Sequence, residues 1–215
     1  MSNQAKSNPI LPISNIFYSI QGEGRYAGTP AIFIRTYGCN LACPWCDEPL
    51  HRTRRHDMSA DEIILAAKQV MDITKCEGTP MVVITGGEPT IHKTLPVLIR
   101  RLRNALKPPL IAVESNGYDM GMVAMADPAT WITYSPKGDF FLYPHWNELK
   151  LVVNTKTDLE PLLKIARNTI RPVYLQPMAG GAEIIHENVQ FAMDAIKKYP
   201  FLKLSLQIHK MIGIA

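Results

Sequence analysis

The sequence predicts an α/β fold with a largely parallel sheet, and three observations support this prediction. Short apolar runs alternate with amphipathic stretches along the chain. Most of these runs are apolar at odd and even positions alike, as strands covered on both faces of a sheet are. No repeat or linker divides the 215 residues into two compositional halves. With about seven strands expected, an incomplete or modified barrel is favoured over a full eightfold one.

The composition is that of a globular protein, with 47% hydrophobic residues, 20% charged residues and a formal net charge of +4. This mildly basic balance permits an anionic small molecule as ligand and does not imply nucleic acid. No apolar run reaches the roughly 18 residues of a membrane span. Residues 1–14 are polar and lack the apolar core of a secretory signal. We therefore expect a mobile N-terminal arm over 1–14, a single domain over 15–215 and a cytoplasmic protein.

Apolar runs that are rich in β-branched and aromatic residues are predicted to form the strands. In chain order they cover residues 31–36, 81–85, 110–115, 131–135, 148–153, 172–176 and 202–207. The stretches predicted to form helices cover 59–73, 94–106, 157–168 and 187–198. The first of these begins with Ser59 and carries Glu62 three positions later, which is the pattern of a capping box. The third repeats this pattern with Thr157 and Glu160.

Polar and glycine-rich segments follow the predicted strands directly. In order they read GCNLACPWCDEP, GGEPTIH, ESNGYD, SPKGD and QPMAGG. In parallel α/β folds the loops at the carboxyl ends of the strands lie together and carry the chemistry. We therefore expect these five segments to surround one functional site.

Cys39, Cys43 and Cys46 lie within eight residues in the spacing C-x3-C-x2-C. In a cytoplasmic protein this spacing favours metal or redox chemistry over a disulfide framework. Three thiolates would hold a 4Fe-4S cluster with one iron left open for a small molecule, since a fully ligated cluster uses four cysteines. A structural zinc completed by His51 or a distant cysteine is one alternative, and three buried unligated thiols are another.

The cysteine spacing, with the aromatic Trp45 before the last cysteine, resembles the signature of radical S-adenosylmethionine (SAM) enzymes. A Gly86-Gly87-Glu88-Pro89 segment about forty residues further on strengthens this resemblance. Adjacent glycines let the backbone come close to a ligand. The resemblance implies a modified, incomplete (β/α) barrel of the radical SAM type, with a 4Fe-4S cluster and SAM as cofactors.

The chain more closely resembles the family of 7-carboxy-7-deazaguanine synthases, nearly from end to end. The matching segments read FYSIQGEGRYAGTPAIFIRTYGCNLACPWCD, VVITGGEPTIH, ESNG, WITYSPK, ELKLVV, YLQP and LSLQIHKMIGIA. QGEG before the cysteines and QIHK near the C-terminus are the specific parts, because radical SAM enzymes at large lack both.

This closer resemblance implies a lyase of the queuosine and 7-deazapurine pathway, whose product is used in tRNA modification or in DNA modification. The family converts 6-carboxy-5,6,7,8-tetrahydropterin to 7-carboxy-7-deazaguanine with loss of ammonia, by a radical ring contraction. The resemblance also implies a flavodoxin-like or ferredoxin-like electron donor and a homodimer. It implies no direct contact with nucleic acid or membrane.

The resemblance also assigns roles to single residues, with no catalytic residue beyond the cluster and the cofactor. The cluster would be held by Cys39, Cys43 and Cys46. The positions that match the SAM site are Trp45, Cys46, Asp47, Gly87, Glu88, Ser115, Ser135, Pro136, Lys137 and Gln176. The positions that match the pterin site are Ile20, Gln21, Gly22, Glu23, Arg35, Thr85, His209 and Ala215. Among these, Arg35 matches the partner of the substrate carboxylate, a role that suits a planar and permanently charged group.

Several of these residues also have ordinary structural explanations. The segment around Gln21 and Glu23 could be a polar turn. Arg35 lies in an apolar strand and could pair with a structural acid, because a buried arginine needs a partner. His209 could be an ordinary histidine in a closing strand. The basic run 51–56 matches no family segment and is expected to be a solvated or disordered loop.

One position departs from the family pattern. The family typically reads Cys-Asp-Thr after the cluster, and that threonine ligates a magnesium ion that bridges the substrate. This chain reads Cys46-Asp47-Glu48 instead. A carboxylate is a better ligand than a hydroxyl for a hard cation, so we expect Glu48 to ligate a retained Mg2+. There are two alternatives. Glu48 could take over the orienting role of the ion, or the substrate itself could differ.

Two rival functions stay open on the sequence alone. A zinc-stabilised binding module without catalysis needs a fourth ligand such as His51 and gives no reason for GGEP, SPK and QIHK to follow strands. A related radical SAM enzyme with a different substrate, for instance an activase that installs a glycyl radical, would share the cluster and the cofactor.

Overall fold

The structure is a computed structural model that describes residues 8–137, 145–181 and 183–214. Within these residues the backbone is organised by a nine-stranded sheet with the strand order β3-β1-β2-β4-β5-β6-β7-β8-β9. Its strands are β1 (Ile10–Ile20), β2 (Pro30–Thr36), β3 (His56–Ser59), β4 (Met81–Gly86), β5 (Ile111–Ser115), β6 (Trp131–Tyr134), β7 (Glu148–Val153), β8 (Val173–Pro177) and β9 (Leu202–Leu204). Every predicted strand is present, whereas β1 and β3 were not predicted.

Parallel pairing dominates this sheet. Every neighbouring pair from β2 to β9 is parallel. At one end of the sheet, β1 pairs antiparallel with both β2 and β3. Because β3 and β9 stand at opposite ends of the strand order, the described sheet is open rather than closed into a barrel. The predicted α/β class with a modified, incomplete barrel is confirmed.

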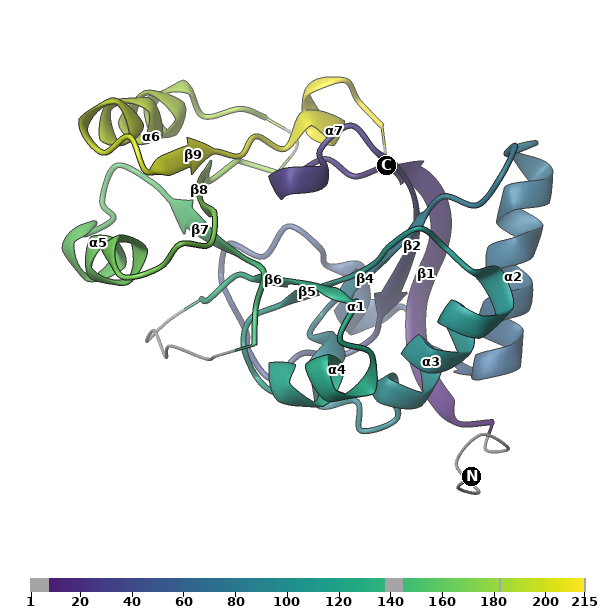
Figure 1. Cartoon of the computed structure of the whole chain (residues 1–215). Helices are drawn as coiled ribbons and strands as arrows, with labels where there is room; N and C mark the ends of the chain where they lie inside the picture. The colour runs from purple at the N-terminus through teal and green to yellow at the C-terminus, as the bar shows by residue number, and fades with distance from the viewer. Residues whose placement is uncertain (1–7, 138–144, 182, 215) are drawn as a thin grey trace.

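Helices connect most of the parallel strands. In the described residues they are α1 (Leu50–Thr53), α2 (Ala60–Ile73), α3 (Leu95–Leu106), α4 (Met120–Ala126), α5 (Glu160–Arg167), α6 (His186–Lys198) and α7 (Ile208–Met211), with the short 3-10 helices η2 (Gly24–Tyr26) and η3 (Pro89–Ile91). In Figure 1, α2 to α6 follow the outside of the curved sheet, whereas α7 and the C-terminal end lie over its inner side. None of the described helices has the length and apolar character needed to cross a membrane.

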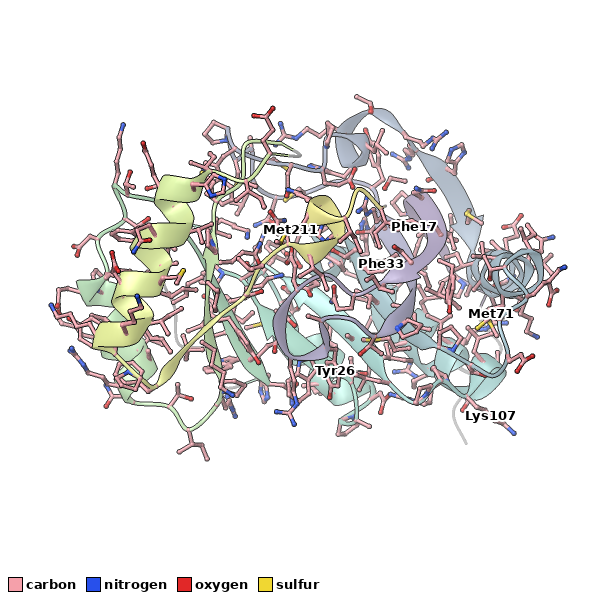
Figure 2. All side chains as sticks on the ribbon, turned by 90° about the horizontal axis from the view of Figure 1, so that it is seen from above. Phe17, Tyr26, Phe33, Met71, Lys107 and Met211 are labelled. Atoms are coloured by element: carbon pink, nitrogen blue, oxygen red, sulfur yellow. The ribbon has the colours of Figure 1, made fainter. Side chains whose placement is uncertain are left out.

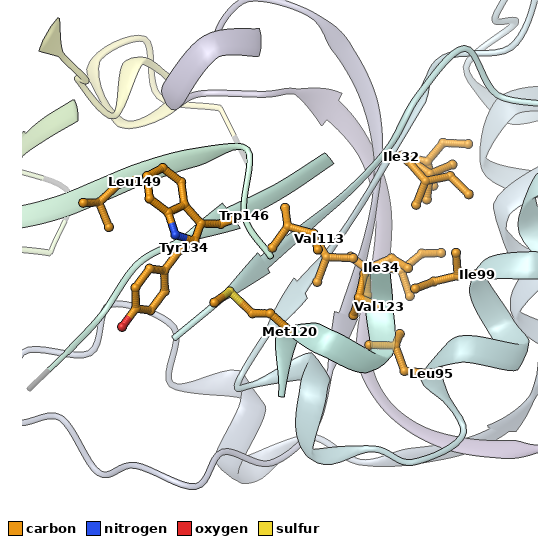
Figure 3. Close-up of a cluster of buried hydrophobic side chains, with 14 of the residues drawn as sticks. Ile32, Ile34, Leu95, Ile99, Val113, Met120, Val123, Tyr134, Trp146 and Leu149 are labelled. Carbon is orange, nitrogen blue, oxygen red and sulfur yellow. The ribbon is translucent and has the colours of Figure 1, made fainter. Parts of the chain in front are cut away.

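Alternate residues of the central strands enter two separate apolar clusters, as the two-residue period of a strand requires. Val82 and Ile84 of β4 join the main core against the helices. Met81 and Val83 point the other way and belong to a smaller cluster. Figure 3 shows part of the main core, where Ile34 of β2 lies near side chains of α3. This burial on both faces explains why the predicted strands are apolar at odd and even positions.

Strand β1 corrects the predicted N-terminal arm. The arm was predicted to extend to residue 14, but residues 10–14 belong to β1, where Leu11 and Ile13 are buried in the main core. Pro9 and Pro12 lower the strand propensity of this segment, so its local sequence argues against a strand. Pairing with β2 and β3 overrides that propensity. Residues 1–7 lie outside the described part of the chain.

The basic run 51–56 also differs from its prediction. Its first part forms α1 and its last residue begins β3. The three arginines of the run are exposed, as predicted, whereas His51 is buried. The prediction is wrong for His51 because its ring turns inward, toward the thiol of Cys46.

The two predicted capping boxes have different outcomes. At the start of α2, the backbone N–H of Glu62 donates to the Ser59 hydroxyl and the N–H of Ser59 donates to the Glu62 carboxylate, which confirms the first box. The second box is wrong, because α5 begins only at Glu160 and Thr157 accepts a hydrogen bond from the N–H of Asn154. A turn closed between these two residues places the threonine before the helix instead of at its cap.

Replacing Ser59 with alanine removes the confirmed box, and we expect it to lower the free energy of unfolding by about 1 kcal/mol. Urea denaturation followed by circular dichroism measures this change. Thr94→Ala is the matched control, since Thr94 is the N-cap of α3 and makes no side-chain capping bond. It should cost less than about half as much as Ser59→Ala. Equal losses in the two variants would show that the box contributes nothing of its own.

Candidate functional site

A cavity of about 400 Å³ opens at the carboxyl ends of the parallel strands. All five segments that were predicted to converge contribute to its lining, through Cys46, Gly87, Asn116, Lys137 and Met178 among others. Parallel strands place their carboxyl ends at one edge, which is why loops far apart in the sequence meet here. The predicted convergence is confirmed.

The predicted site residues reach this cavity almost without exception. Those that line it are Ile20, Gln21, Gly22, Glu23, Arg35, Cys39, Cys43, Trp45, Cys46, Asp47, Glu48, Thr85, Gly87, Glu88, Ser115, Ser135, Lys137, Gln176 and His209. Pro136 is not part of the lining, and Ala215 lies outside the described residues. The structure thus brings the predicted residues together, while the role of each one stays a prediction.

An aromatic wall beside a cation forms one side of the cavity, from β1 and β2. Phe17 and Phe33 stack with their ring centroids 5.1 Å apart, and Figure 2 shows these side chains next to each other. The guanidinium carbon of Arg35 lies 4.8 Å from the centroid of Phe17. This combination suits a planar ligand that carries a negative charge.

The three predicted ligand thiols lie on the loop after β2. Each is a free, half-buried thiol on the cavity. Burial raises the pKa of Cys39 above its usual value. The thiol of Cys76 lies apart from this loop, 3.6 Å from the hydroxyl of Tyr18, and does not line the cavity.

The donor chemistry of these three thiols limits the kind of metal centre that they can hold. Among the described residues, no three His, Cys, Asp or Glu side chains meet closely enough to form a finished metal site. The chemistry of the set, three soft thiols on one loop without a fourth sulfur, fits a 4Fe-4S cluster that keeps one open iron.

His51 is the fourth ligand that the zinc alternative requires. Its Nε2 atom lies 3.4 Å from the sulfur of Cys46, and its Nδ1 atom has no hydrogen-bond partner among the described residues. Burial lowers the pKa of His51, which favours the neutral ring. An imidazole next to one thiol is compatible with a hydrogen bond to sulfur and with a metal bond, so this contact does not separate zinc from a cluster.

The GGEP segment packs directly against the cysteine loop. The N–H of Gly87 donates to the carbonyl of Thr36 at 3.1 Å, and the N–H of Glu88 donates to the carbonyl of Gly38 at 2.9 Å. A Cβ atom on Gly87 would lie 1.8 Å from that Gly38 carbonyl oxygen, and Gly86 has a φ of +118°. Only glycine permits this approach and this backbone conformation.

The side chain of Glu88 is used within the protein. Its carboxylate accepts hydrogen bonds from the N–H and hydroxyl of Thr90 at 3.0 and 2.6 Å, from the hydroxyl of Ser115 at 2.9 Å and from the N–H of Asn116 at 2.6 Å. Burial raises the pKa of Glu88, and these four donors oppose that rise. The carboxylate therefore ties the loop after β4 to the loop after β5.

Lys137 connects the loop after β6 to the cysteine loop. Its Nζ atom donates to the hydroxyl of Ser135 at 2.7 Å and lies 5.4 Å from the ring centroid of Trp45. Burial and the charge of Lys150 lower the pKa of Lys137. Two predicted cofactor segments are thus held in contact.

Lys150 of β7 is a buried cation to which no role was predicted. Its ammonium group forms ion pairs with Glu23 and with Glu114, the latter at 2.8 Å. Burial alone would lower the pKa of Lys150, but the charges of Glu114 and Glu23 raise it above its usual value. Gln21 also donates to Glu114, at 3.2 Å. The lysine therefore stays charged and holds two carboxylates on the cavity wall.

A signal for Lys150 was present in the sequence. It is the lone charge within the apolar part of ELKLVV, a strand predicted to be covered on both faces. A buried ammonium group needs an anionic partner, so its position indicates a buried ion pair. The identity of the partners could not be read in the same way.

The C-terminal segment supplies a further wall of the cavity. Gln207 donates to Glu23 at 2.7 Å and to Asp47 at 3.1 Å, and Lys210 forms an ion pair with Asp47. Burial alone would raise the pKa of Asp47, but the hydrogen bonds of Lys210 and Gln207 lower it to about 2. These contacts fix the end of the chain against the cysteine loop.

His209 lies in α7 and not in a closing strand. Its ring occupies the space beside Gly22, where a Cβ atom would lie 1.9 Å from His209 Nδ1. The N–H of Ile208 donates to the carbonyl of Gly22 at 3.1 Å. The QIHK and QGEG segments, which were predicted to act together, are therefore in direct contact.

The predicted partner of the substrate carboxylate and the predicted metal ligand are paired with each other. Arg35 forms an ion pair with Glu48, and these side chains are only 26% and 16% exposed. The N–H of Leu50 donates to Glu48 Oε1 at 3.1 Å and fixes the carboxylate. Two residues that were expected to bind different ligands thus bind each other.

The chain is similar to known proteins in sequence and in fold. The model of the Radical SAM superfamily matches residues 33–136. The chain is 31% identical to the 7-carboxy-7-deazaguanine synthase of Prochlorococcus marinus, over 95% of this chain and 98% of that protein. It is 34% identical to the 7-carboxy-7-deazaguanine synthase of Bacteroides thetaiotaomicron, over 94% and 97%. It also resembles the crystal structure of QueE from Escherichia coli, with a TM-score of 0.69 and 27% identity over 92% of this chain and 93% of that chain.

The open parallel sheet, the three-cysteine loop and the matching superfamily model define the chain as a radical SAM protein. That class implies a 4Fe-4S cluster and SAM, and it decides against the zinc-stabilised binding module. The similarity to the curated relatives spans nearly the full length of both chains. The chain belongs to the family of 7-carboxy-7-deazaguanine synthases.

Replacing Gly87 with alanine should push the cysteine loop away from the GGEP segment, because the new Cβ atom has no room beside the Gly38 carbonyl. We expect the reconstituted variant to retain less than about half of the iron of the wild type, since metal ligands tolerate little displacement. Iron analysis and the visible absorption spectrum measure this. Gly180→Ala is the control, because its Cβ atom would meet only Ile185, at 3.5 Å. Equal iron content in both variants would contradict the role given to Gly87.

Proposed function

We propose that this chain is a lyase that converts 6-carboxy-5,6,7,8-tetrahydropterin to 7-carboxy-7-deazaguanine with loss of ammonia, in the queuosine and 7-deazapurine pathway. One observation supports this most: the cysteine loop, the GGEP segment, Arg35, Glu23 and His209 border one cavity. The volume of about 400 Å³ is in the range of small-molecule sites. The residues that match the substrate site and those that match the cofactor site therefore border one space.

The polar wall around Glu23 suits the ring system of a pterin. The amino group and ring N–H at one edge of a pterin are donors, and Glu23 and Glu114 present acceptor oxygens. Burial opposes ionisation of Glu23, but the charge of Lys150 lowers the pKa of Glu23, so it is an acceptor at neutral pH. A site built to bond such donors discriminates against analogues that lack them.

Arg35 and the aromatic wall suit the other end of the substrate. A guanidinium group binds a carboxylate through two parallel hydrogen bonds, which orients as well as attracts it. His209 of α7 reaches the same cavity, next to Gly22. Further proposed substrate contacts are Ile20, Gln21, Gly22, Thr85 and Ala215.

The cofactors would occupy the side of the cavity formed by the cysteine loop. Cys39, Cys43 and Cys46 would hold the 4Fe-4S cluster. SAM would contact the loops after β4, β5, β6 and β8, together with Trp45 and Asp47. When bound, the two cofactors supply a carbon radical that takes a hydrogen atom from the substrate. The residues of the chain position both ligands and keep water away from them.

We propose that Mg2+ binds at Glu48. In proteins Mg2+ is held by one or two carboxylates and completes its shell with water and substrate oxygens. Glu48 offers such a carboxylate at the cavity, but Arg35 occupies it. A cation must therefore take this carboxylate from Arg35.

Two protein partners are part of the proposal. A radical SAM enzyme needs an electron donor, for which we propose an acidic flavodoxin-like or ferredoxin-like protein. Arg52 and Arg54 support this, because they are exposed, follow the cysteine loop and have no ion pair among the described residues. Basic side chains near the cluster would steer an acidic partner. The homodimer is proposed from family membership alone.

The activity is tested with protein purified and reconstituted anaerobically, to about four irons per chain. Incubation with SAM, dithionite, Mg2+ and 6-carboxy-5,6,7,8-tetrahydropterin should yield 7-carboxy-7-deazaguanine, detected by liquid chromatography and mass spectrometry. Cleavage of SAM without this product would indicate a related radical enzyme with another substrate. A colourless protein that holds zinc and no iron would overturn the cluster itself.

Reversing the charges of Arg52 and Arg54, by Arg52→Glu together with Arg54→Glu, should slow reduction of the cluster by an acidic flavodoxin about tenfold or more at low salt. Stopped-flow absorbance measures this rate. Dithionite, a small anionic reductant that needs no docking surface, should show a much smaller change in rate between the variant and the wild type. The control reverses two exposed arginines at the other end of the sheet, Arg167 and Arg171. Unchanged reduction by flavodoxin would contradict the proposed docking surface.

A further inference from the structure

The ion pair between Arg35 and Glu48 joins two structural elements at the edge of the cavity. Arg35 belongs to β2 and Glu48 to the loop that carries the three cysteines. The guanidinium group is also held against the ring of Phe17, and Glu48 is held by the N–H of Leu50. Both side chains are mostly out of water. The pair is therefore fixed from both sides.

Three of the other four acids on the cavity have cations of their own, and the fourth, Glu88, is held by neutral hydrogen-bond donors. Glu23 and Glu114 are paired with Lys150, and Asp47 is paired with Lys210. Among the described residues, Arg35 forms an ion pair with Glu48 and with no other acid. Displacing Glu48 from Arg35 would leave a poorly hydrated carboxylate without a counter-ion, which is costly.

This arrangement creates a conflict if the proposed function is correct, and the inference rests on that function. The proposed substrate brings a carboxylate to Arg35, where Glu48 already lies. A substrate carboxylate that arrives alone gains one ion pair and breaks another, so its net gain is small. A divalent cation on Glu48 would remove the conflict, because it neutralises the displaced carboxylate.

We propose that Glu48 is a latch on Arg35, which a divalent cation opens. In the free enzyme Glu48 occupies Arg35. When the cation binds Glu48, Arg35 is released for the substrate carboxylate, so the cation and the substrate bind cooperatively. By linkage each raises the affinity of the other by the same factor.

The latch also determines which ligands the site accepts. A bare anion is disfavoured, because it must displace Glu48 without providing a new partner for it. A pterin without a carboxylate leaves the pair intact and gains nothing from the cation. The site then selects its ligand in two ways: Arg35 attracts a carboxylate, and the cost of displacing Glu48 disfavours other anions.

Isothermal titration calorimetry tests the latch without relying on turnover. The protein is anaerobically reconstituted, loaded with SAM and freed of divalent cations. The probes are 6-carboxypterin, a stable oxidised analogue, and pterin, which lacks the carboxylate. Each is titrated with and without Mg2+ into the wild type and into Glu48→Gln. The amide keeps an oxygen for the N–H of Leu50 but has no charge for Arg35 or Mg2+.

We expect Mg2+ to tighten the binding of 6-carboxypterin to the wild type by about tenfold, within the usual range of coupling between sites. Without Mg2+, Glu48→Gln should bind 6-carboxypterin at least about fivefold more tightly than the wild type does, and Mg2+ should change its affinity less than about twofold. Pterin should bind the two proteins equally, whether Mg2+ is present or not. The effect of the latch should therefore be seen in the affinity for 6-carboxypterin and not in the affinity for pterin.

Asp57→Asn is the matched control. Asp57 also pairs with an arginine, Arg55, but this pair is about half exposed and does not line the cavity. The Asp57→Asn variant should bind both probes with the same affinity as the wild type. Circular dichroism checks that both variants are folded.

The outcomes separate this inference from the proposed function. If metal-free Glu48→Gln binds 6-carboxypterin no better than the wild type, or keeps the full effect of Mg2+, the latch is overturned while the pterin site stands. If neither pterin binds either protein under any condition, the proposed function is overturned and the latch with it.

Discussion

A single buried ammonium group, that of Lys150, constrains much of the inner side of the sheet. A charge removed from water is tolerated only with anionic partners. The partners of Lys150 are Glu23, in the loop between β1 and β2, and Glu114 of β5. Since β1, β5 and β7 are not neighbours in the sheet, this ion network spans several strands. Loss of either carboxylate would leave the buried charge of Lys150 only partly neutralised, so Glu23, Glu114 and Lys150 depend on one another.

The two halves of the cavity are built by different kinds of interaction. On the side of the cysteine loop, glycines and the buried Glu88 bring backbones together through short hydrogen bonds. On the side of Glu23 and Arg35, ion pairs determine the shape. The first kind leaves little room for change and suits a metal centre, whose ligands must be placed closely. The second kind can exchange partners and suits the binding of a charged substrate.

Ligand binding at such a site is an exchange of ion pairs rather than the filling of an empty space. Four of the five acids at the cavity wall, Glu23, Glu48, Glu114 and Asp47, each have a basic partner within the chain. A ligand therefore gains affinity only by the difference between the new pairs and the old ones. The glutamate at position 48 adds such a cost at Arg35. Because of this cost, ligand affinity should depend more on the charge of the ligand and on the presence of a cation than on the area of contact.

From the sequence alone one could predict the parallel sheet and the loops that share one edge, and propose the cysteine loop as the place of a metal centre. Those features depend on local periodicity, on spacing and on the rule that parallel strands end at one edge. The prediction failed at β1, whose prolines argue against a strand, and at Thr157, whose capping pattern lies before its helix. The sequence also indicated that Arg35 needs an anionic partner, which could be a ligand carboxylate or an acid of the chain. Only the tertiary structure decided that Arg35 meets Glu48, because an ion pair depends on distance in space, which neither residue type nor sequence spacing determines.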